Sequence, residues 1–277
     1  MNKQTIIVSA FPKSGSTWLT RLLADILNCP SAGSHSSQDK QEIASEGWDR
    51  SGDFIVRKGH YRLNNYSVTW NETEHPNSSM IEAPHILCLD KRTNERIIFL
   101  IRDPRDIIVS ACHHWKKKDR QEIIKLVCHG GLANLPAWDE YIKQWLDIDK
   151  DKWAFIKQIT IANYNDNLLN EHEKKEIVKW VKYEDLIVEE YGEIDYILRN
   201  IDYNESRVFP AIKRQSFNNR KKEIAQNGND LYLGKEYNLQ FMRKGIVEDY
   251  KNFLTNKEQD YVWNCLGETM EGVGYER

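Results

Sequence analysis

A short turn near the amino terminus carries the residues best suited to chemistry. Residues 12–17 read PKSGST, between an apolar run at 5–8 and a segment at 18–27 whose apolar residues recur at helical spacing. This pattern predicts a strand, a turn and a helix. At such a junction the free backbone N–H groups and the positive helix end point to one place, where an anion can bind.

Side chains in this turn add to the prediction of an anion site. Gly15 lets the backbone approach a ligand closely, Ser16 and Thr17 offer hydroxyl donors, and Lys13 adds a positive charge. The turn is not a Walker A loop, because GxxxxGK[ST] is absent and the lysine precedes the glycine. An ordinary turn between a strand and a helix is the alternative.

A second pattern of strand, turn and helix spans residues 99–115, FLIRDPRDIIVSACHHW. Arg102 lies at the carboxyl end of the predicted strand, where ligands of open α/β sheets bind. Ser110 follows two turns into the predicted helix, and an arginine fork with a hydroxyl group can hold a phosphate. A buried Arg102 paired with Asp103 or Asp106 fits the sequence equally well.

A third segment, residues 241–255, places Arg243, Lys244 and Gly245 before a predicted helix. The cations and the free N–H groups of the helix start would face the same way, which suits a phosphate. A solvated basic turn is the alternative.

The order of these motifs resembles that of an enzyme family. PKSGSTW, RDPRD with its later serine, KYED at 182–185 and RKG follow one another as in the cytosolic-type sulfotransferases, whose donor is 3′-phosphoadenosine-5′-phosphosulfate (PAPS). The resemblance covers nearly the whole chain and is weakest at 30–95 and 119–176. The chain also resembles bacterial sulfotransferases that tailor natural products, including guanidinium alkaloids of the saxitoxin type.

This resemblance implies a role for each motif. The 5′-phosphosulfate would contact Lys13, Ser14, Gly15, Ser16 and Thr17. The 3′-phosphate would contact Arg102, Ser110, Arg243, Lys244 and Gly245. The adenine would lie between Trp18 and Phe217, with a polar contact from Tyr183, whereas a core role is the alternative for Trp18 and Phe217. The product would be 3′,5′-ADP.

The resemblance also implies the catalytic residues. Sulfuryl transfer resembles phosphoryl transfer, so the protein mainly positions the partners and stabilises charge on the leaving oxygen, for which Lys13 is placed. Lys58-Gly59-His60 is similar to the family's Lys-Thr-His, which implies that His60 is the base and that Lys58 helps stabilise the sulfuryl oxygens. Gly59 departs from the family's threonine. Without this pattern, a structural role for His60 is favoured.

Composition excludes several classes of protein. The chain has 277 residues, a net charge of −3 and a pI near 6.3, which argues against a general nucleic-acid binder. No apolar stretch approaches the roughly 20 residues of a membrane span, and no secretory signal is evident. Five scattered cysteines without CxxC spacing indicate reduced thiols in the cytoplasm. His113 and His114 lack a third ligand at metal spacing, so we expect no metal.

The sequence predicts one α/β domain, residues 1–277, with a central parallel sheet flanked by helices. Further strands are expected at 53–57, 96–101 and 177–183. Helices are expected after Pro104, within 137–162, near 187–200 and 205–214, and at 256–266, where Thr255 can cap the helix. Residues 30–52 are expected to form a long loop, and residues 218–240 a flexible lid.

The acceptor is the least defined part of the prediction. Its pocket is expected from residues 30–90, 113–140 and 218–240, where the family match is weakest. Carboxylates interleaved with aromatic side chains suit a polar, cationic small molecule, with a hydroxyl group or a nitrogen as the sulfated atom, although solvated acids fit equally. These residues are Asp39, Glu42, Glu46, Asp49, Glu72, Glu74 and Glu82, with Trp48, Tyr66 and Trp70.

Two other functions are weighed against a sulfotransferase. A P-loop kinase would need a Walker A motif, which is absent, and a carboxylate for Mg²⁺. A non-catalytic nucleotide-binding protein would have no use for Lys13, Lys58 and His60 together.

Residues 251–260, KNFLTNKEQD, partly resemble the family's short dimer motif. Lys251 and Thr255 match it, but Asn256 and Asp260 replace its valine and glutamate. We therefore expect a monomer or a weak homodimer.

Overall fold

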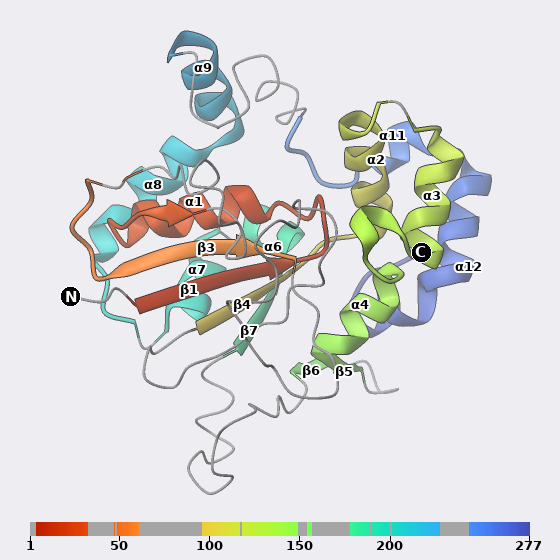
Figure 1. Ribbon diagram of the computed structural model, residues 1–277, viewed down its shortest axis with the longest axis horizontal. Coiled ribbons are helices and arrows are strands. Elements are labelled where there is room, and N and C mark those ends of the chain that lie inside the picture. Colours follow the sequence, from red (N-terminus) through yellow and green to blue (C-terminus); the bar gives the residue numbers. More distant parts are fainter. Residues whose placement is uncertain are drawn as a thin grey trace, which may run out of the picture.

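Five parallel strands form the centre of the molecule (Figure 1). Their spatial order is β2-β3-β1-β4-β7. They comprise β1 (Gln4–Ala10), β2 (Ser31–Ala32), β3 (Phe54–Gly59), β4 (Arg96–Ile101) and β7 (Val178–Lys182). The structure is a computed structural model that describes residues 4–32, 47, 49–60, 96–116, 118–148, 154–156, 178–188, 190–199, 201–227 and 244–277.

Helices cover both faces of the sheet, as predicted. Successive side chains of a strand point to opposite faces, so the apolar strand β4 contributes to two separate cores. Ile98 and Leu100 belong to one core, and Ile97 and Phe99 belong to the other. The first core is completed by α1 (Ser16–Ile26), α6 (Tyr183–Val188), α7 (Glu190–Leu198) and α8 (Val208–Gln215).

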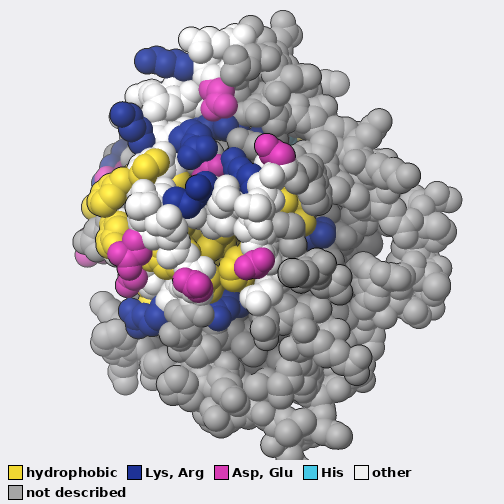
Figure 2. Space-filling view, turned by 90° about the vertical axis from the view of Figure 1, so that its left-hand side faces the viewer, with side chains coloured by type: hydrophobic (Ala, Val, Ile, Leu, Met, Phe, Trp, Pro, Cys, Tyr) yellow, Lys and Arg dark blue, Asp and Glu magenta, His cyan; other side chains and the backbone are white. Residues whose placement is uncertain are grey.

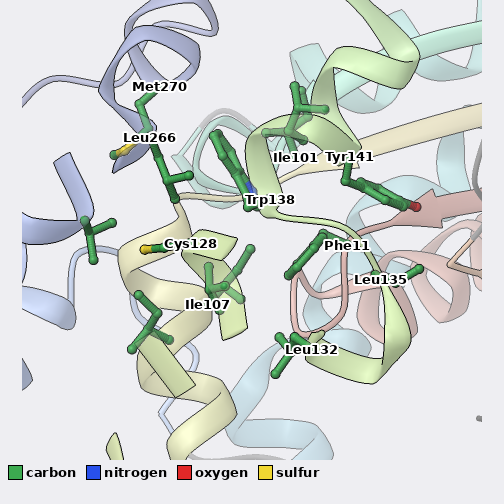
Figure 3. Close-up of a cluster of buried hydrophobic side chains, with 14 of the residues drawn as sticks. Phe11, Ile101, Ile107, Cys128, Leu132, Leu135, Trp138, Tyr141, Leu266 and Met270 are labelled. Atoms are coloured by element: carbon green, nitrogen blue, oxygen red, sulfur yellow. The ribbon is translucent and has the colours of Figure 1, made fainter. Parts of the chain in front are cut away.

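The second core is larger and rich in aromatic residues. Its helices are α2 (Pro104–His114), α3 (Arg120–His129), α4 (Trp138–Trp145) and α12 (Asn256–Gly272). Figure 3 shows Phe11, from the turn after β1, among side chains of this core that include Trp138 and Tyr141. The rings of Phe11 and Tyr141 meet edge to face at 5.5 Å, which packs the anion-site turn against the core.

Two predicted helix starts are capped, α2 by Asp103, a cap not predicted from the sequence, and α12 by Thr255, as predicted. The Asp103 carboxylate accepts the Arg105 N–H at 2.8 Å, and Pro104 occupies the first turn of α2. Thr255 and Glu258 form a reciprocal capping box at the start of α12. The predicted helix at 256–266 is confirmed and extends to Gly272.

The structure refines three expectations for helices, the acceptor pocket and loops. Within 137–162, α4 ends at Trp145, and β5 (Leu146–Ile148) then pairs antiparallel with β6 (Ala154–Ile156), because short apolar strands followed the helical pattern directly. Within 113–140, α3 turns its apolar side chains into the core, so they are not free to line an acceptor pocket; these are Ile123, Ile124, Val127 and Cys128.

The third correction concerns the expected lid. Residues 217–227 form α9 (Phe217–Asn227), since arginine, lysine, glutamate, alanine and glutamine there favour a helix even without an apolar stripe. The rest of the predicted lid, 228–240, lies outside the described residues. The remaining short elements are η2 (Leu132–Asn134), η3 (Glu205–Arg207) and α11 (Tyr250–Phe253). In the part of the chain that the structure describes, no helix is both long and apolar enough to cross a membrane.

Candidate active site

The turn between β1 and α1 has the backbone shape that an anion site needs. Gly15 precedes the first residue of α1 with a φ of 95°, in the left-handed region that favours glycine. A Cβ atom at Gly15 would lie 2.7 Å from the Tyr183 ring, so a side chain would not fit. Ser14 and Ser16 are buried, and Thr17 is half-buried on the first turn of α1.

Three cations meet at this turn. Arg102 Nη1 donates to the Lys13 carbonyl at 3.1 Å, and Lys58 Nζ donates to Thr17 Oγ1 at 3.1 Å. Burial, and then the charges of Lys58 and Arg102, lower the pKa of Lys13 from its ordinary value of 10.5 to about 7. Like charges held this close favour the binding of an anion among them.

Two buried donors fit the same interpretation. Ser14 Oγ and Arg102 Nε are both buried and have no hydrogen-bond partner among the described residues. Buried polar atoms are nearly always paired, and an unpaired one calls for an explanation. A phosphosulfate at the turn would supply an acceptor for Ser14 Oγ, and a second phosphate beside it would supply one for Arg102 Nε, so the two donors fit a ligand with two anionic groups.

The structure bears on the alternative proposed for Arg102. Asp103 pairs instead with Arg105, whose Nη2 lies 2.7 Å from its carboxylate, while Arg102 lies 3.9 Å from Asp106. The Arg102 guanidinium also stacks 4.4 Å from the centre of the Tyr183 ring. Arg102 therefore lies beside the turn of Lys13 and keeps a long ion pair with Asp106, so the pairing with Asp103 is excluded and the pairing with Asp106 is present.

The structure describes most, but not all, of the residues predicted to bind the 3′-phosphate. Ser110 is half-buried on α2, two turns after Arg102, and Arg243 lies outside the described residues. Lys244 and Gly245 are exposed, and Lys244 Nζ pairs with Asp249 at 3.1 Å.

A carboxylate ties this segment to the helix of Ser110. Asp106, on the first turn of α2, accepts the backbone N–H groups of Glu248 and Tyr250 at 2.8 and 3.0 Å. The segment that begins at Lys244 is thus held against the same helix that carries Ser110.

The expected adenine residues form two separate contacts in the structure. Trp18 is half-buried and packs against the first core, and its ring meets Tyr183 edge to face at 5.7 Å. Phe217 begins α9, and its ring lies so close to Gly245 that a Cβ there would be 2.7 Å from it. The structure therefore joins Trp18 to Tyr183 and Phe217 to Gly245.

The end of β3 brings the predicted base to the same place. Val8 and Ser9 of β1 pair in register with Lys58 and Gly59, so the carboxyl ends of the two strands are adjacent. His60 Nδ1 lies 2.6 Å from the Ala10 carbonyl. A carbonyl only accepts, so Nδ1 carries the proton and the lone pair of the neutral ring is on Nε2. This tautomer can act as a base.

One residue near the cations has no role in the predicted mechanism. His114 is partly exposed near the end of α2, one turn after Ser110. Burial, and then Lys13 and Lys58, lower its pKa to about 4, so the ring is neutral at pH 7. Its four-residue spacing from Ser110, which puts both on one helix face, is the sequence signal that could have revealed it.

A buried carboxyl supports the turn after β4. Glu184, of the KYED segment, accepts the Asp103 N–H at 3.1 Å and the Tyr275 O–H at 2.7 Å. Burial raises its pKa to about 7. It thus fixes the backbone next to Arg102.

Most of the residues predicted around the acceptor lie outside the described residues. Of the acids and aromatics expected around the acceptor, only Asp49 is among the described residues, and it is exposed. The described residues contain no group of three or more histidine, cysteine, aspartate or glutamate side chains that could hold a metal ion.

Comparison with known proteins identifies the family. The model of the sulfotransferase domain matches residues 3–274. Sulfotransferase 2A1 of Macaca fascicularis is 26% identical over 264 residues, covering 91% of this chain and 79% of that protein. Cytosolic sulfotransferase 5 of Arabidopsis thaliana is 25% identical over 286 residues, covering 97% and 80%.

Solved structures agree on the fold. Mouse sulfotransferase SULT7A1 complexed with PAP superposes with a TM-score of 0.60 and 19% identity, over 98% of this chain and 84% of that one. Retinol dehydratase in complex with retinol and PAP gives 0.58 and 15%, over 100% and 84%. Because the domain model spans nearly the whole chain, the protein belongs to the sulfotransferase domain family and is a sulfotransferase of the PAPS-dependent class that its motifs resemble.

Proposed function

We propose that the protein transfers the sulfuryl group of PAPS to a hydroxyl group or to an amine or carbamoyl nitrogen of a small molecule and releases 3′,5′-ADP. The observation that carries this proposal is the meeting of Lys13, Lys58 and Arg102 where β1, β3 and β4 end. Two structural neighbours were solved with PAP, which is 3′,5′-ADP, and this supports the same nucleotide here.

The turn residues would bind and orient the donor. Backbone N–H groups at the start of α1, with Ser14 and Thr17, would hold the 5′-phosphosulfate. Arg102, Ser110 and Lys244 would hold the 3′-phosphate, with Arg243 and Gly245 of the same segment. Bound PAPS supplies an activated sulfuryl group.

The adenine would lie at the aromatic side chains. Trp18 and Phe217 would stack on the base, and Tyr183 would contact its edge.

Two side chains would move or stabilise charge during transfer. His60 Nε2 would take the proton of the attacking hydroxyl or nitrogen as the new bond to sulfur forms. Lys13 would stabilise the negative charge on the phosphate oxygen as the bond between that oxygen and sulfur breaks. Lys58, held at Thr17, would stabilise the sulfuryl oxygens.

A polar, cationic acceptor is our preferred class. The acids interleaved with aromatics in residues 39–82, and the resemblance to natural-product tailoring enzymes of the saxitoxin type, support it. The whole chain, residues 1–277, would act as a single domain in the cytoplasm, with no nucleic acid, membrane or metal involved.

A turnover assay tests this function. The protein is incubated with PAPS and a panel of amines, guanidinium compounds, phenols and alcohols, and products are read by mass spectrometry for a gain of one sulfuryl group. Lys13→Met is the matched control and should form at least about a hundredfold less product. Phosphorylated products formed from ATP and Mg²⁺ would instead support the kinase, and tight binding of 3′,5′-ADP without any turnover would support the non-catalytic protein.

A further inference from the structure

A buried carboxylate on α1 lies at the centre of a network outside the residues assigned to the donor. Asp25 is 1% exposed and forms an ion pair with Arg50 at 2.5 Å and another with Arg214 at 3.3 Å. Its Oδ2 also accepts a hydrogen bond from Gln215 Nε2 at 2.5 Å. A buried carboxylate needs charged or hydrogen-bonding partners. Two of the partners of Asp25, Arg214 and Gln215, belong to α8, far from α1 in the sequence.

Both ends of α8 are attached to this one turn of α1. Arg207, just before α8, donates to the Asp25 carbonyl with Nε at 3.2 Å and Nη2 at 3.1 Å. Arg214 and Gln215, at the other end, contact the Asp25 carboxylate. The face seen in Figure 2 carries a group of Lys and Arg side chains, and α8 lies on that side in Figure 1. The carbonyl and the carboxylate of Asp25 therefore hold both ends of α8 against α1.

The attached end of α8 in turn fixes two aromatic residues. Trp18 Nε1 donates to the Gln215 carbonyl at 3.1 Å, so the orientation of the indole depends on the position of Gln215. Phe217 follows two residues later and starts α9, with its ring against Gly245. One corner, residues 215–217, thus sets the positions of both side chains that would stack on adenine.

Asp25 does not reach this place itself. It follows Trp18 by seven residues, which is two helical turns or about 10 Å along the axis. Its effect on Trp18 passes through the side chain and then the backbone of Gln215.

We propose that Asp25, acting through Gln215, is the positioning residue for the nucleobase end of the donor site. This rests on the proposed binding of 3′,5′-ADP. The contact of Asp25 with Gln215 holds the corner of α8 and α9, so that Trp18 and Phe217 are placed for the base before it binds.

The experiment compares a ligand that has the base with one that lacks it. Calorimetry measures the affinities of 3′,5′-ADP and of ribose 3,5-bisphosphate for the wild type and for Gln215→Met, which removes the amide but keeps the size and the backbone carbonyl. We expect affinity for 3′,5′-ADP to fall about tenfold, the order expected when base stacking is weakened, with no change for the base-free probe.

Two further variants control for folding. Gln121→Met removes a similar contact far from the nucleotide, since Gln121 Nε2 donates to Glu258 at 2.6 Å; it should leave both affinities unchanged. Asp25→Asn keeps an oxygen for Gln215 but loses the charge that attracts Arg50 and Arg214, so it should reduce 3′,5′-ADP affinity less than Gln215→Met. If Gln215→Met does not fold, Asp25→Asn alone decides.

The outcomes separate the two proposals. Equal losses for both ligands, or no loss for either, in a folded variant would overturn the positioning role. Failure of the wild type to bind 3′,5′-ADP more tightly than the base-free probe would instead contradict the proposed nucleotide.

Discussion

Lys13 is buried beside two other cations, which lowers the stability of the folded protein and favours the binding of an anion. Its pKa in the folded protein is about 7, well below the ordinary 10.5, because of burial and the neighbouring Lys58 and Arg102. A group with a depressed pKa contributes stability above its unfolded value, and this contribution is lost as the pH falls through the folded value. As the pH falls from about 10.5 to about 7, the unfolded chain binds a proton that the folded Lys13 does not, so the protein loses stability, and a bound anion would offset this loss.

Nucleotide binding should accordingly take up a proton. The phosphates of 3′,5′-ADP would raise the pKa of Lys13, so at about pH 8.5 binding should take up close to one proton, falling toward zero at about pH 6, where Lys13 is already charged. Calorimetry in buffers of different ionisation enthalpy measures this number. Lys13→Met should abolish the uptake, and an unchanged uptake in that variant would assign the proton to another group.

His60 should matter for rate and not for donor binding. In the proposed mechanism its Nε2 removes a proton in the transition state, while Nδ1 is held by the Ala10 carbonyl. His60→Ala should lower kcat by about 10²–10⁴ and leave the affinity for 3′,5′-ADP nearly intact. Single-turnover kinetics with an alcohol or amine acceptor measures this, because a very acidic hydroxyl would ionise unaided.

His114→Ala is the matched comparison for His60. Its ring is neutral and lies near Lys13 and Lys58, so it is a second histidine beside these cations. If His114→Ala lost the greater part of kcat and His60→Ala did not, the base would be reassigned. Loss of donor affinity and folded yield together in His60→Ala would indicate a structural histidine.

At the scale of elements, the sequence is most informative where the signals for a strand or a helix lie within one short segment. The sequence predicts the strand before PKSGST and the strand RIIFLI from their apolar runs, and the helix after Pro104 from the proline and the helical spacing that follows it. The sequence predicts a strand at 53–57. The observed strand β3 extends to Gly59, so Lys58 lies on the strand and His60 directly follows it.

Elements and contacts that depend on the tertiary structure were missed. Helix α9 has no apolar stripe, so the sequence predicts a flexible lid there, and β5 continues an apolar pattern directly from α4. The contact of Asp25 with Gln215 joins residues 190 positions apart, and no periodicity reports such a pair. For the same reason the pKa values of Lys13 and His114 could not be read from the sequence.

Helix α12 offers a test at this scale. Thr255 Oγ1 accepts the Glu258 N–H at 3.3 Å, and Glu258 accepts the Thr255 N–H at 2.8 Å. Thr255→Ala should lower the free energy of unfolding by about 1 kcal/mol, within the usual 0.5–2 kcal/mol for such caps. Urea denaturation measures this loss. Sulfuryl transfer should be unaffected, because α12 packs in the second core; a parallel loss of donor affinity would contradict that.

At the scale of the molecule, the sheet has a core on each face, and the carboxyl ends of its strands form the edge at which the cations meet. The cations come from the ends of three neighbouring strands, whereas Trp18 and Phe217 belong to α1 and α9. In the proposed binding mode the phosphate groups would be held at the carboxyl ends of the strands, and the base would be held by side chains of α1 and α9. This division is why a change at Gln215 is expected to spare the base-free probe.

Assembly is the last property to be tested at this scale. The segment that resembles the dimer motif has its matching side chains engaged within the chain: Lys251 pairs with Glu248 at 2.7 Å, and Thr255 caps α12. Asn256 is exposed where the motif has an apolar valine, so a contact there would bury little apolar surface. Sedimentation should show a monomer or a weak dimer. Asn256→Val should strengthen association and Lys251→Glu should not, while a tight wild-type dimer that survives Lys251→Glu would show that another surface mediates assembly.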